Sequence, residues 1–445
     1  MTSFLVRVTP RDPLPSDSEV LLLDWFADQR AASTIQSDPR FLRDLAPGTV
    51  AGELLRLAAG AYCADKLALR RLTPDRWTRE LLLDVPVSNP TQWQTVSTVL
   101  TEALDFLTGD RWTLAFREAA PIQGSRRLAN EGNVDAVCLF SGGLDSLCGA
   151  IDLLEEGNRL CLVGHYEGGL IPGVQERLAA ELAEHYGADR VELRQLFLRP
   201  APSSADQARP LPRRRERSTR GRSLLFIAAG LAVADALGPT TPLYVPENGF
   251  IGINVPLSRA RSGSLSTRTT HPWFVRCLGE AIRTLGIANQ LRNPYRLQSK
   301  GTMLTGSRNR RLLNRLAPLS VSCAHPEASR WHRRRQGNCG YCYPCLIRRS
   351  AMHTARWDGG DAYTWDVLED PRVLERNRRI GADLRAILAA ISREWSARDV
   401  LRNGPVPDGE APAFADVVHR GHAELRNWLE TGTSPTLRAR LRAVT

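Results

Sequence analysis

Apolar and polar residues alternate with two different periods along this chain of 445 residues. From residue 134 onward, short apolar runs that are typical of buried strands take turns with stretches of helical period. The runs VDAVCLF, RLCLVGHY and VELRQLF predict strands, and the stretches at 144–157 and 174–187 predict the helices between them. A further helix at 223–237 and a strand at 242–246 continue this pattern, and a long polar loop is expected from there to His271. Such alternation predicts an α/β fold with a parallel sheet that carries helices on both faces.

The sequence before this region gives similar signals and is interpreted as a separate unit. Strand-like alternation occurs at 77–87 and 112–119, and helical periodicity occurs at 49–71 and 91–109. A polar stretch with Gly and Pro follows at 120–133 and is typical of a linker. We therefore expect residues 1–130 to form an N-terminal accessory α/β domain, which docks a partner or closes a pocket.

Helical patterns dominate the end of the chain. Helices are predicted near 273–286 and 299–316, and the residues after 355 are mostly helical and polar, with an amphipathic stretch at 412–431. The chain therefore divides into the N-terminal domain, a central unit over 134–355 and a helical C-terminal extension over 356–445.

Basic residues exceed acidic ones, and this excess bears on possible partners. The formal net charge of +11 permits a nucleic acid or another polyanion as partner, but the charge is spread along the chain and does not favour one. Of the 59 basic residues 57 are arginine, which we interpret as codon bias, so the two lysines, Lys66 and Lys300, stand out. We identify no signal peptide and no apolar run of membrane-spanning length, and we expect a cytoplasmic protein.

The stretch SGGLDS joins the first strand of the central unit to its first helix. A strand that runs through a glycine turn into a helix directs backbone N–H groups and the positive end of the helix dipole at an anion. Gly142 and Gly143 let the backbone approach a phosphate, and the hydroxyls of Ser141 and Ser146 add donors. Asp145 would orient the turn or help to hold Mg²⁺, because a carboxylate alone repels phosphate. The alternative is a glycine turn that only packs the helix on the strand.

Four of the nine cysteines are clustered near the end of the central unit. The stretch from Cys323 to Cys345 has the spacing C-x15-C-x2-C-x2-C, which brings Cys339, Cys342 and Cys345 onto one knuckle. Four thiolates with no open position predict a structural Zn²⁺ site, and an iron–sulfur cluster is the alternative. The other five cysteines are scattered, and we expect them to be reduced and to pack as small apolar residues.

The SGGLDS turn resembles the pyrophosphate loop of the ATP pyrophosphatase (PP-loop) superfamily. With the cysteine pattern behind it, the central unit is similar to the 7-cyano-7-deazaguanine synthases (QueC). The resemblance implies the PP-loop, HUP-like form of the α/β fold, and adenylation of 7-carboxy-7-deazaguanine with release of pyrophosphate and transfer to ammonia. It implies ATP, Mg²⁺ and Zn²⁺ as cofactors. The turn residues expected to bind ATP are Ser141, Gly142, Gly143, Leu144, Asp145 and Ser146.

The same resemblance assigns further residues to the site. Arg222 lies where the family has an arginine in a Gly-Arg-Asn turn, which implies contact with ATP phosphates. Lys300 matches a family lysine in front of a helix, and an ammonium there would stabilise the charge that develops as the acyl phosphate forms. Asp145 and Lys300 are therefore the expected catalytic residues. The residues expected to bind the deazaguanine are Asn248, Asn254 and Arg268.

The chain also departs from QueC enzymes. A different sequence at 247–274 replaces their Ser-Gly-Tyr-Pro-Asp-Cys-Arg segment, and HYEGG at 165–169 replaces their Tyr-Gly-Gln-Arg. These departures and the extra terminal regions resemble the QatC group of QueC-like proteins in bacterial Qat anti-phage systems. The wider group is thought to join the deazaguanine carboxylate to a protein amine. The resemblance therefore implies a role in anti-phage defence and a protein partner from the same operon.

Other classes of protein share parts of this pattern. A tRNA-modifying thiolase of the PP-loop superfamily needs a reactive cysteine pair, whereas the four clustered cysteines favour metal binding. A glutamine-dependent synthetase needs its own nucleophile, and Cys63 in an apolar helix is a poor one. A non-catalytic ATP-binding scaffold of a defence complex is also compatible with the motifs. The basic run at 213–217 is expected to be a solvated loop, with a polyanion grip as its alternative.

Overall fold

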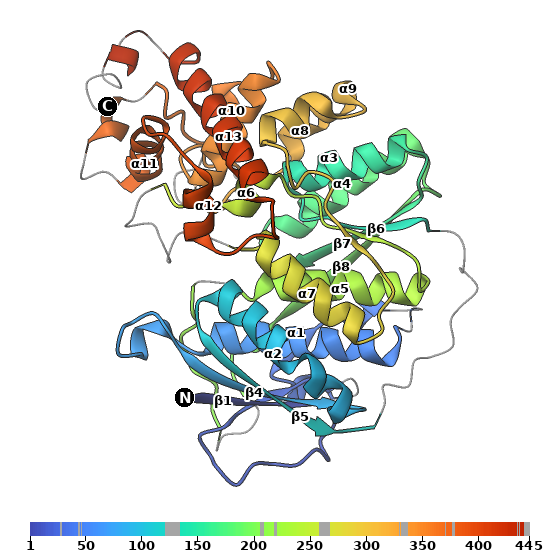
Figure 1. Cartoon of the computed structure of the whole chain (residues 1–445). Coiled ribbons are helices and arrows are strands. Elements are labelled where there is room, and N and C mark those ends of the chain that lie inside the picture. Colours follow the sequence, from blue (N-terminus) through green and yellow to red (C-terminus); the bar gives the residue numbers. More distant parts are fainter. Residues whose placement is uncertain are drawn as a thin grey trace.

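The computed structural model shows an α/β protein with two sheets of mainly parallel strands (Figure 1), as the sequence predicts. In the part of the chain that the structure describes, no helix combines the length and apolar character that a membrane crossing requires. The predicted linker lies outside the described residues from residue 121 onward. The structure describes residues 1–26, 29–42, 45, 47–120, 134–204, 209–217, 220–257, 268–328, 330, 337–369, 371–375, 379–433, 435 and 437–439.

The first sheet consists of four parallel strands in the order β2-β1-β4-β5. Helix α1 packs against β1 and β4, and helix α2 packs against β5. Helix α2 begins at Pro90 because the side chain of Asn89 accepts a hydrogen bond from the Gln92 N–H, and it ends at the left-handed Gly109. The bounds are β1 Thr2–Arg7, β2 Leu21–Asp24, α1 Thr49–Leu67, β4 Glu80–Val87, α2 Pro90–Thr108 and β5 Arg111–Glu118.

The second sheet has six strands in the order β10-β9-β6-β7-β8-β3. All strands from the central unit are parallel, and β3 from the N-terminal region pairs antiparallel with β8 at the edge. The chain lays down β6, β7 and β8 in one direction and then returns to the other side of β6 with β9. Ligands of open parallel sheets bind at such a switch point, outside the carboxyl ends of the strands. The bounds are β3 Ile35–Ser37, β6 Ala136–Leu139, β7 Leu160–Tyr166, β8 Val191–Pro200, β9 Leu243–Tyr244 and β10 Leu291–Arg292.

Helices cover both faces of the second sheet (Figure 1). Helices α3 and α4 pack on one face, and α5 packs on the other. Helix α1 lies against α5, and α2 lies against α7, so one hydrophobic core continues from the first sheet to the second. The N-terminal unit is therefore fixed to the central unit through a shared apolar interior. The bounds are α3 Leu144–Glu155, α4 Ile171–Tyr186, α5 Arg222–Leu237 and α7 Pro272–Thr284.

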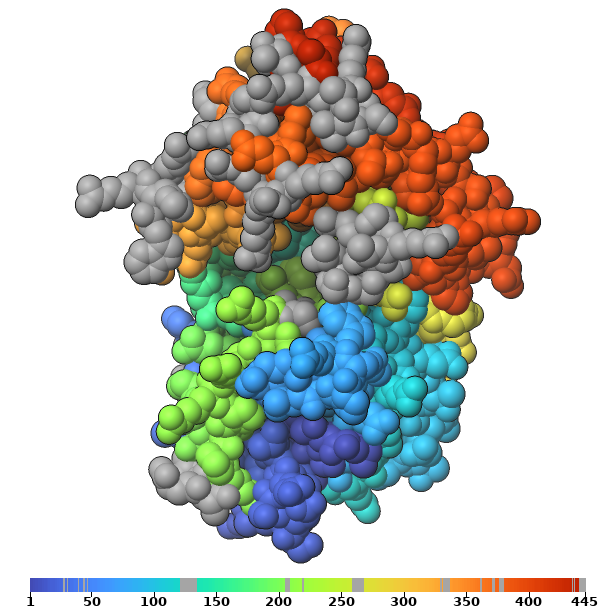
Figure 2. Space-filling view, turned by 90° about the vertical axis from the view of Figure 1, so that its left-hand side faces the viewer, coloured from blue at the N-terminus to red at the C-terminus, as the bar shows by residue number. Residues whose placement is uncertain are grey.

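The last part of the chain is helical and builds a second core. Helix α13 packs against α10, α12, α11 and the short helix α6. In the space-filling view, the orange and red C-terminal residues form the upper part of the molecule and the blue N-terminal residues the lower part (Figure 2). The bounds are α6 Gly249–Ile253, α8 Lys300–Gly306, α9 Arg310–Leu316, α10 Tyr343–Thr354, α11 Ala382–Ile391, α12 Ala397–Asn403 and α13 Ala411–Thr431.

Two predicted elements differ from the structure for local reasons. The helix expected at 299–316 is broken into α8 and α9, because Asp152 accepts hydrogen bonds from the Ser307 hydroxyl and the Arg308 N–H, and Asn309 begins a new helix. The polar stretch after β9 was expected to be a loop, but its first residues form α6, which Asn248 starts by accepting from the Ile251 N–H.

Candidate functional site

The SGGLDS turn connects β6 to α3 at the carboxyl edge of the second sheet. Gly142 adopts a φ of +80°, which a residue with a side chain rarely tolerates. The Ser141 Oγ accepts from the Gly143 N–H at 3.3 Å, and the Ser146 Oγ donates to the Gly143 carbonyl at 3.0 Å. The turn is therefore held by its own serines at the N-terminus of a helix, as an anion-binding turn requires.

The segment that leads into the cysteine cluster also holds this turn. The Val321 N–H donates to the Gly142 carbonyl at 2.9 Å, and the Leu144 N–H donates to the Ser322 Oγ at 3.0 Å. The first N–H groups of a helix have no acceptor within it, so Ser322 satisfies one of those of α3. The geometry of the turn thus depends on a segment that is remote in sequence and is fixed by the cysteines.

A buried cluster of charged and polar side chains lies beside the turn. The Lys300 Nζ and an Asp145 carboxylate oxygen are 2.5 Å apart, with side chains that are only 7% and 10% exposed. The other Asp145 oxygen accepts from the Asn248 side-chain amide at 2.7 Å. Asp145 follows β6 and Asn248 follows β9, so the cluster lies at the switch point of the sheet, where Lys300 reaches it from the segment after β10. The structure brings together three of the predicted site residues.

Glu247 belongs to the same cluster and was not predicted. It follows β9 and precedes Asn248, and its backbone is held by Asn293. Burial and the negative charge of Asp145 together raise the pKa of Glu247 to about 8, although the ammonium of Lys300 opposes this shift. Two carboxyl groups thus face one ammonium away from water, and the Glu247 carboxyl carries a proton at neutral pH. The one signal in the sequence is that Glu247 comes directly after the strand predicted at 242–246.

Helix α8, which begins with Lys300, is held at both ends. At its start, the Glu424 carboxylate of α13 accepts from the Gly301 N–H at 3.0 Å and the Thr302 N–H at 3.2 Å, and also bonds the Ser299 hydroxyl. At its end, Asp152 of α3 accepts from Ser307. Burial raises the pKa of Glu424, whereas the three donors lower it. The C-terminal extension therefore fixes the lysine, which no sequence signal could indicate across this separation.

Arg222 begins α5 on the opposite face of the sheet. Its Nε donates to the His165 Nδ1 and its Nη2 donates to the His165 carbonyl, both at 3.0 Å. Burial lowers the pKa of His165 to about 3, with a further contribution from the Arg222 charge, so the imidazole is neutral. The expected contact of Arg222 with ATP phosphates stays a prediction, because its guanidinium is engaged with the end of β7.

The other two residues expected to bind the substrate have structural contacts. Asn254 ends α6 in the left-handed conformation with a φ of 39°, and its carbonyl accepts from the Asn403 side chain. Arg268 donates to the Phe106 carbonyl at 2.8 Å and its guanidinium covers the Phe106 ring. Arg268 therefore bridges the central unit to helix α2 of the N-terminal unit. Neither contact is with Asp145 or Lys300, and the role of both residues in substrate binding stays a prediction.

The four clustered cysteines have the arrangement of a metal site. The Sγ atoms of all four lie within 4.8 Å of one another, with 3.8 Å from Cys323 to Cys342 and 3.9 Å from Cys339 to Cys345. Sulfurs around a tetrahedral Zn²⁺ with bonds of about 2.3 Å lie about 3.8 Å apart, so the donor set fits this ion. The N–H groups of His325 and Cys339 donate to the Cys323 sulfur, which favours a thiolate. The cluster could therefore hold a metal ion such as zinc.

Backbone packing keeps the cysteine cluster compact. Gly340 has a φ of +86°, and a Cβ there would lie 2.1 Å from the Trp365 carbonyl oxygen. Helix α10 begins after Cys342 and packs against α8 and α13. The metal site thus supports both the segment over the SGGLDS turn and the helix beside Lys300.

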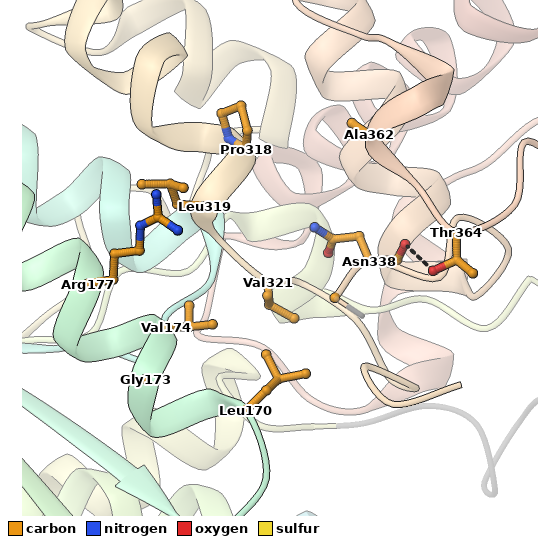
Figure 3. A pocket seen from close by; sticks show the side chains of 11 residues that line it. Leu170, Gly173, Val174, Arg177, Pro318, Leu319, Val321, Asn338, Ala362 and Thr364 are labelled. Atoms are coloured by element: carbon orange, nitrogen blue, oxygen red, sulfur yellow. Dashed lines mark hydrogen bonds between the residues drawn. The ribbon is translucent and has the colours of Figure 1, made fainter. Parts of the chain in front are cut away.

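A cavity of about 260 Å³ adjoins the turn on its α4 side (Figure 3). Val174 and Val321 line it, and Val174 would also contact a Cβ placed on Gly142. Figure 3 shows the Arg177 guanidinium beside Leu319 at one end and Thr364, bonded to the Asn338 carbonyl, at the other. The cavity offers mixed polar and apolar walls next to the turn.

The remaining cysteines lie apart from this chemistry. All five are buried, and burial raises the pKa of Cys138 to about 12 and that of Cys63 further above its ordinary range. A thiol that stays protonated is a poor nucleophile.

Comparison of the chain with protein families, with curated proteins and with solved structures finds no match. Arguments about function therefore depend on the site itself.

Proposed function

We propose that this protein is a QueC-like, ATP-dependent ligase of the PP-loop type that adenylates the carboxylate of 7-carboxy-7-deazaguanine. The observation that carries the proposal is the buried Asp145–Lys300 pair beside the SGGLDS turn, at the switch point of a parallel sheet. An anion-binding turn supplies N–H donors for a phosphate, and a compact ammonium beside it supplies positive charge where the reaction creates negative charge.

In the proposed first step, a substrate carboxylate oxygen attacks the α-phosphorus of ATP. The new oxygen–phosphorus bond replaces the bond to the β-phosphate, and pyrophosphate leaves. In the second step, an amine nitrogen attacks the acyl carbon, the carbon–oxygen bond to AMP breaks, and the amine loses a proton. Lys300 would stabilise the charge that develops on the phosphoryl group, and Asp145 with Asn248 would keep the ammonium in place.

Two ions fit the residues that are present. The carboxylates of Asp145 and Glu247 are oxygen donors of the kind that Mg²⁺ prefers, and a cation would remove their mutual repulsion. Mg²⁺, when bound, would neutralise charge on the ATP phosphates. For the cysteine cluster we favour Zn²⁺ over an iron–sulfur cluster, because four closely spaced thiolates complete a tetrahedron. Its proposed role is structural.

The acceptor amine is proposed to be ammonia or an amine of a partner protein in an anti-phage defence system. The N-terminal and C-terminal parts both contact the central unit, so either could carry the partner. A sulfur-transfer reaction on tRNA is less well supported, because the five cysteines outside the cluster are buried. A non-catalytic scaffold would not need a buried ion pair beside the turn.

The proposal is tested by release of pyrophosphate and AMP from ATP and Mg²⁺ with 7-carboxy-7-deazaguanine. We expect release to need the carboxylate, so that 7-deazaguanine without it gives none. Asp145→Asn should abolish the reaction, whereas Asp135→Asn, an exposed residue just before β6, should retain it. Equal release by the parent protein with and without the carboxylate, or by Asp145→Asn, would contradict the proposal.

A further inference from the structure

The two lysines of this chain lie in corresponding places. In a protein where 57 of 59 basic residues are arginine, Lys300 is buried, Lys66 is partly buried, and both pair with a carboxylate at the carboxyl edge of the second sheet. Lys300 pairs with Asp145 after β6, and Lys66 pairs with Glu167 after β7. Neighbouring strands lie about 4.8 Å apart, so the two pairs follow adjacent strand ends. A composition that otherwise favours arginine makes this coincidence informative.

Lys66 comes from the N-terminal unit. It lies at the last turn of α1, its Nζ is 2.8 Å from a Glu167 oxygen, and its side chain is only 13% exposed. The Tyr62 ring of the same helix lies below the ammonium, at 5.7 Å from its centroid to the nitrogen. Burial lowers the pKa of Lys66 and raises that of Glu167. Removal from water thus disfavours the charged forms of both groups, which offsets part of the attraction between them.

Positive charge exceeds negative charge around this pair. The Arg222 guanidinium is close enough to lower the pKa of Lys66 and is itself bonded to the neutral His165. The negative charge of Asp65 also acts on Lys66, but Asp65 already pairs with Arg79. Lys66 and Arg222 therefore share Glu167, which is 36% exposed at the edge of the sheet. An excess of positive charge that is largely removed from water favours the binding of a further anion.

The N-termini of helices α3 and α5 lie at the same edge of the second sheet. Because α5 connects two parallel strands, its N-terminus with Arg222 lies at the carboxyl edge, where the N-terminus of α3 with the SGGLDS turn also lies. The two N-termini lie on opposite faces of the sheet, with β6 and β7 between them. A polyphosphate held at the turn by one phosphate would extend over the strand ends toward Lys66.

We propose that Lys66 binds the β- and γ-phosphates of ATP and the pyrophosphate that leaves, and that Glu167 holds the ammonium until nucleotide displaces it. The N-terminal unit thereby completes the nucleotide site of the central unit. An ammonium suits this role, because it is a compact charge that can turn from a carboxylate to a phosphate, whereas the wide guanidinium plane cannot. This inference rests on the ATP-dependent function proposed above and adds the residue that binds the leaving group.

The test compares binding of ATP, pyrophosphate and AMP by calorimetry in the full-length protein with Mg²⁺. We expect Lys66→Gln to weaken ATP and pyrophosphate binding by about tenfold or more, the scale of one charge-assisted contact, and to leave AMP binding unchanged. Glu167→Gln should tighten ATP binding several-fold, because it removes the internal competitor. The matched control is Arg111→Gln, which removes a cation of the N-terminal unit from an exposed pair with Glu80 and should change neither.

Each outcome decides the inference. ATP and pyrophosphate affinities of Lys66→Gln equal to those of the parent would overturn it while leaving the proposed function intact. Failure of the parent protein to bind either ATP or AMP would overturn both. If Lys66→Gln does not fold, Glu167→Gln alone decides: tighter ATP binding supports the inference, and unchanged or weaker binding overturns it, since a purely structural ion pair would give no gain in affinity.

Discussion

Replacement of Lys300 by methionine tests the central cluster most fully. The substitution keeps an unbranched side chain that lacks only the terminal ammonium, and it leaves Asp145 and Glu247 facing each other without a cation. Breaking a buried ion pair by removing one partner costs about 3–5 kcal/mol of folding stability. Screening by water reduces this little, because the two side chains are 7% and 10% exposed. We expect a loss in this range in urea titrations followed by tryptophan fluorescence.

Removal of the other partner should cost less. In Asp145→Asn, the charge that raises the pKa of Glu247 is absent, so Glu247 ionises more readily and becomes the counterion of Lys300. The amide also keeps an oxygen that can accept from Asn248. We expect a loss of about 1–3 kcal/mol, and a double variant whose loss is smaller than the sum by about 1–3 kcal/mol. Strictly additive losses would refute the coupling.

Activity separates the chemical role of Lys300 from its structural one. Lys300→Arg keeps a charge in the pair, so folding stability should change less than in Lys300→Met. Pyrophosphate release should nevertheless fall by about a hundredfold, the scale of one well-placed electrostatic donor, because a planar fork cannot occupy the place of an ammonium. ATP affinity should change much less. Parent-like release by Lys300→Arg would refute the catalytic role.

Three further predictions follow from the same contacts. Elemental analysis should find about one zinc per chain in the parent protein. Cys342→Ser should lose this zinc and be poorly soluble, whereas Cys277→Ser outside the cluster should keep it. Iron with visible absorbance in the parent protein would contradict the assignment of zinc. The pKa of Glu247 is raised from 4.5 to about 8, so the folded state binds this proton more tightly than the unfolded state does. Folding stability without added Mg²⁺ should therefore fall as the pH rises from about 4.5 to about 8. Glu247→Gln should remove that fall. Glu424→Gln should lower the turnover number by about tenfold and leave the KM for ATP unchanged, because α8 loses its contacts with a charged acceptor. The control variant Glu430→Gln, on the exposed face of α13, should match the parent in both quantities.

Local signals in the sequence predicted the parts of the fold and site that local geometry determines. The strand, glycine turn and helix around SGGLDS follow from an apolar run, two adjacent glycines and a helical period within about twenty residues. The four cysteines indicate a metal site because short spacings limit where their sulfurs can lie. Helices α1, α2 and α13 were predicted because their apolar faces repeat over many turns.

The rest depends on contacts between remote segments. Strand β10 contains two residues and β3 contains three, too few for a recognisable period, whereas β9 lies within the strand predicted at 242–246. Glu247 reaches Asp145 only because β9 pairs with β6, and Glu424 reaches α8 only because α13 packs across it. Lys66 was noticed for its rarity alone, since its partner Glu167 lies in another unit of the chain. Such pairs are set by the assembled sheet and cannot be derived from spacing.

The most direct measurement follows the oxygen atoms of the carboxylate. The protein is incubated with ATP, Mg²⁺, an amine acceptor and 7-carboxy-7-deazaguanine that carries heavy oxygen in its carboxylate, and the nucleotide product is analysed by mass spectrometry. Attack of the carboxylate on the α-phosphorus predicts that AMP gains one heavy oxygen and that pyrophosphate gains none. Unlabelled AMP, or ADP with labelled phosphate, would contradict adenylation as the reaction of this site.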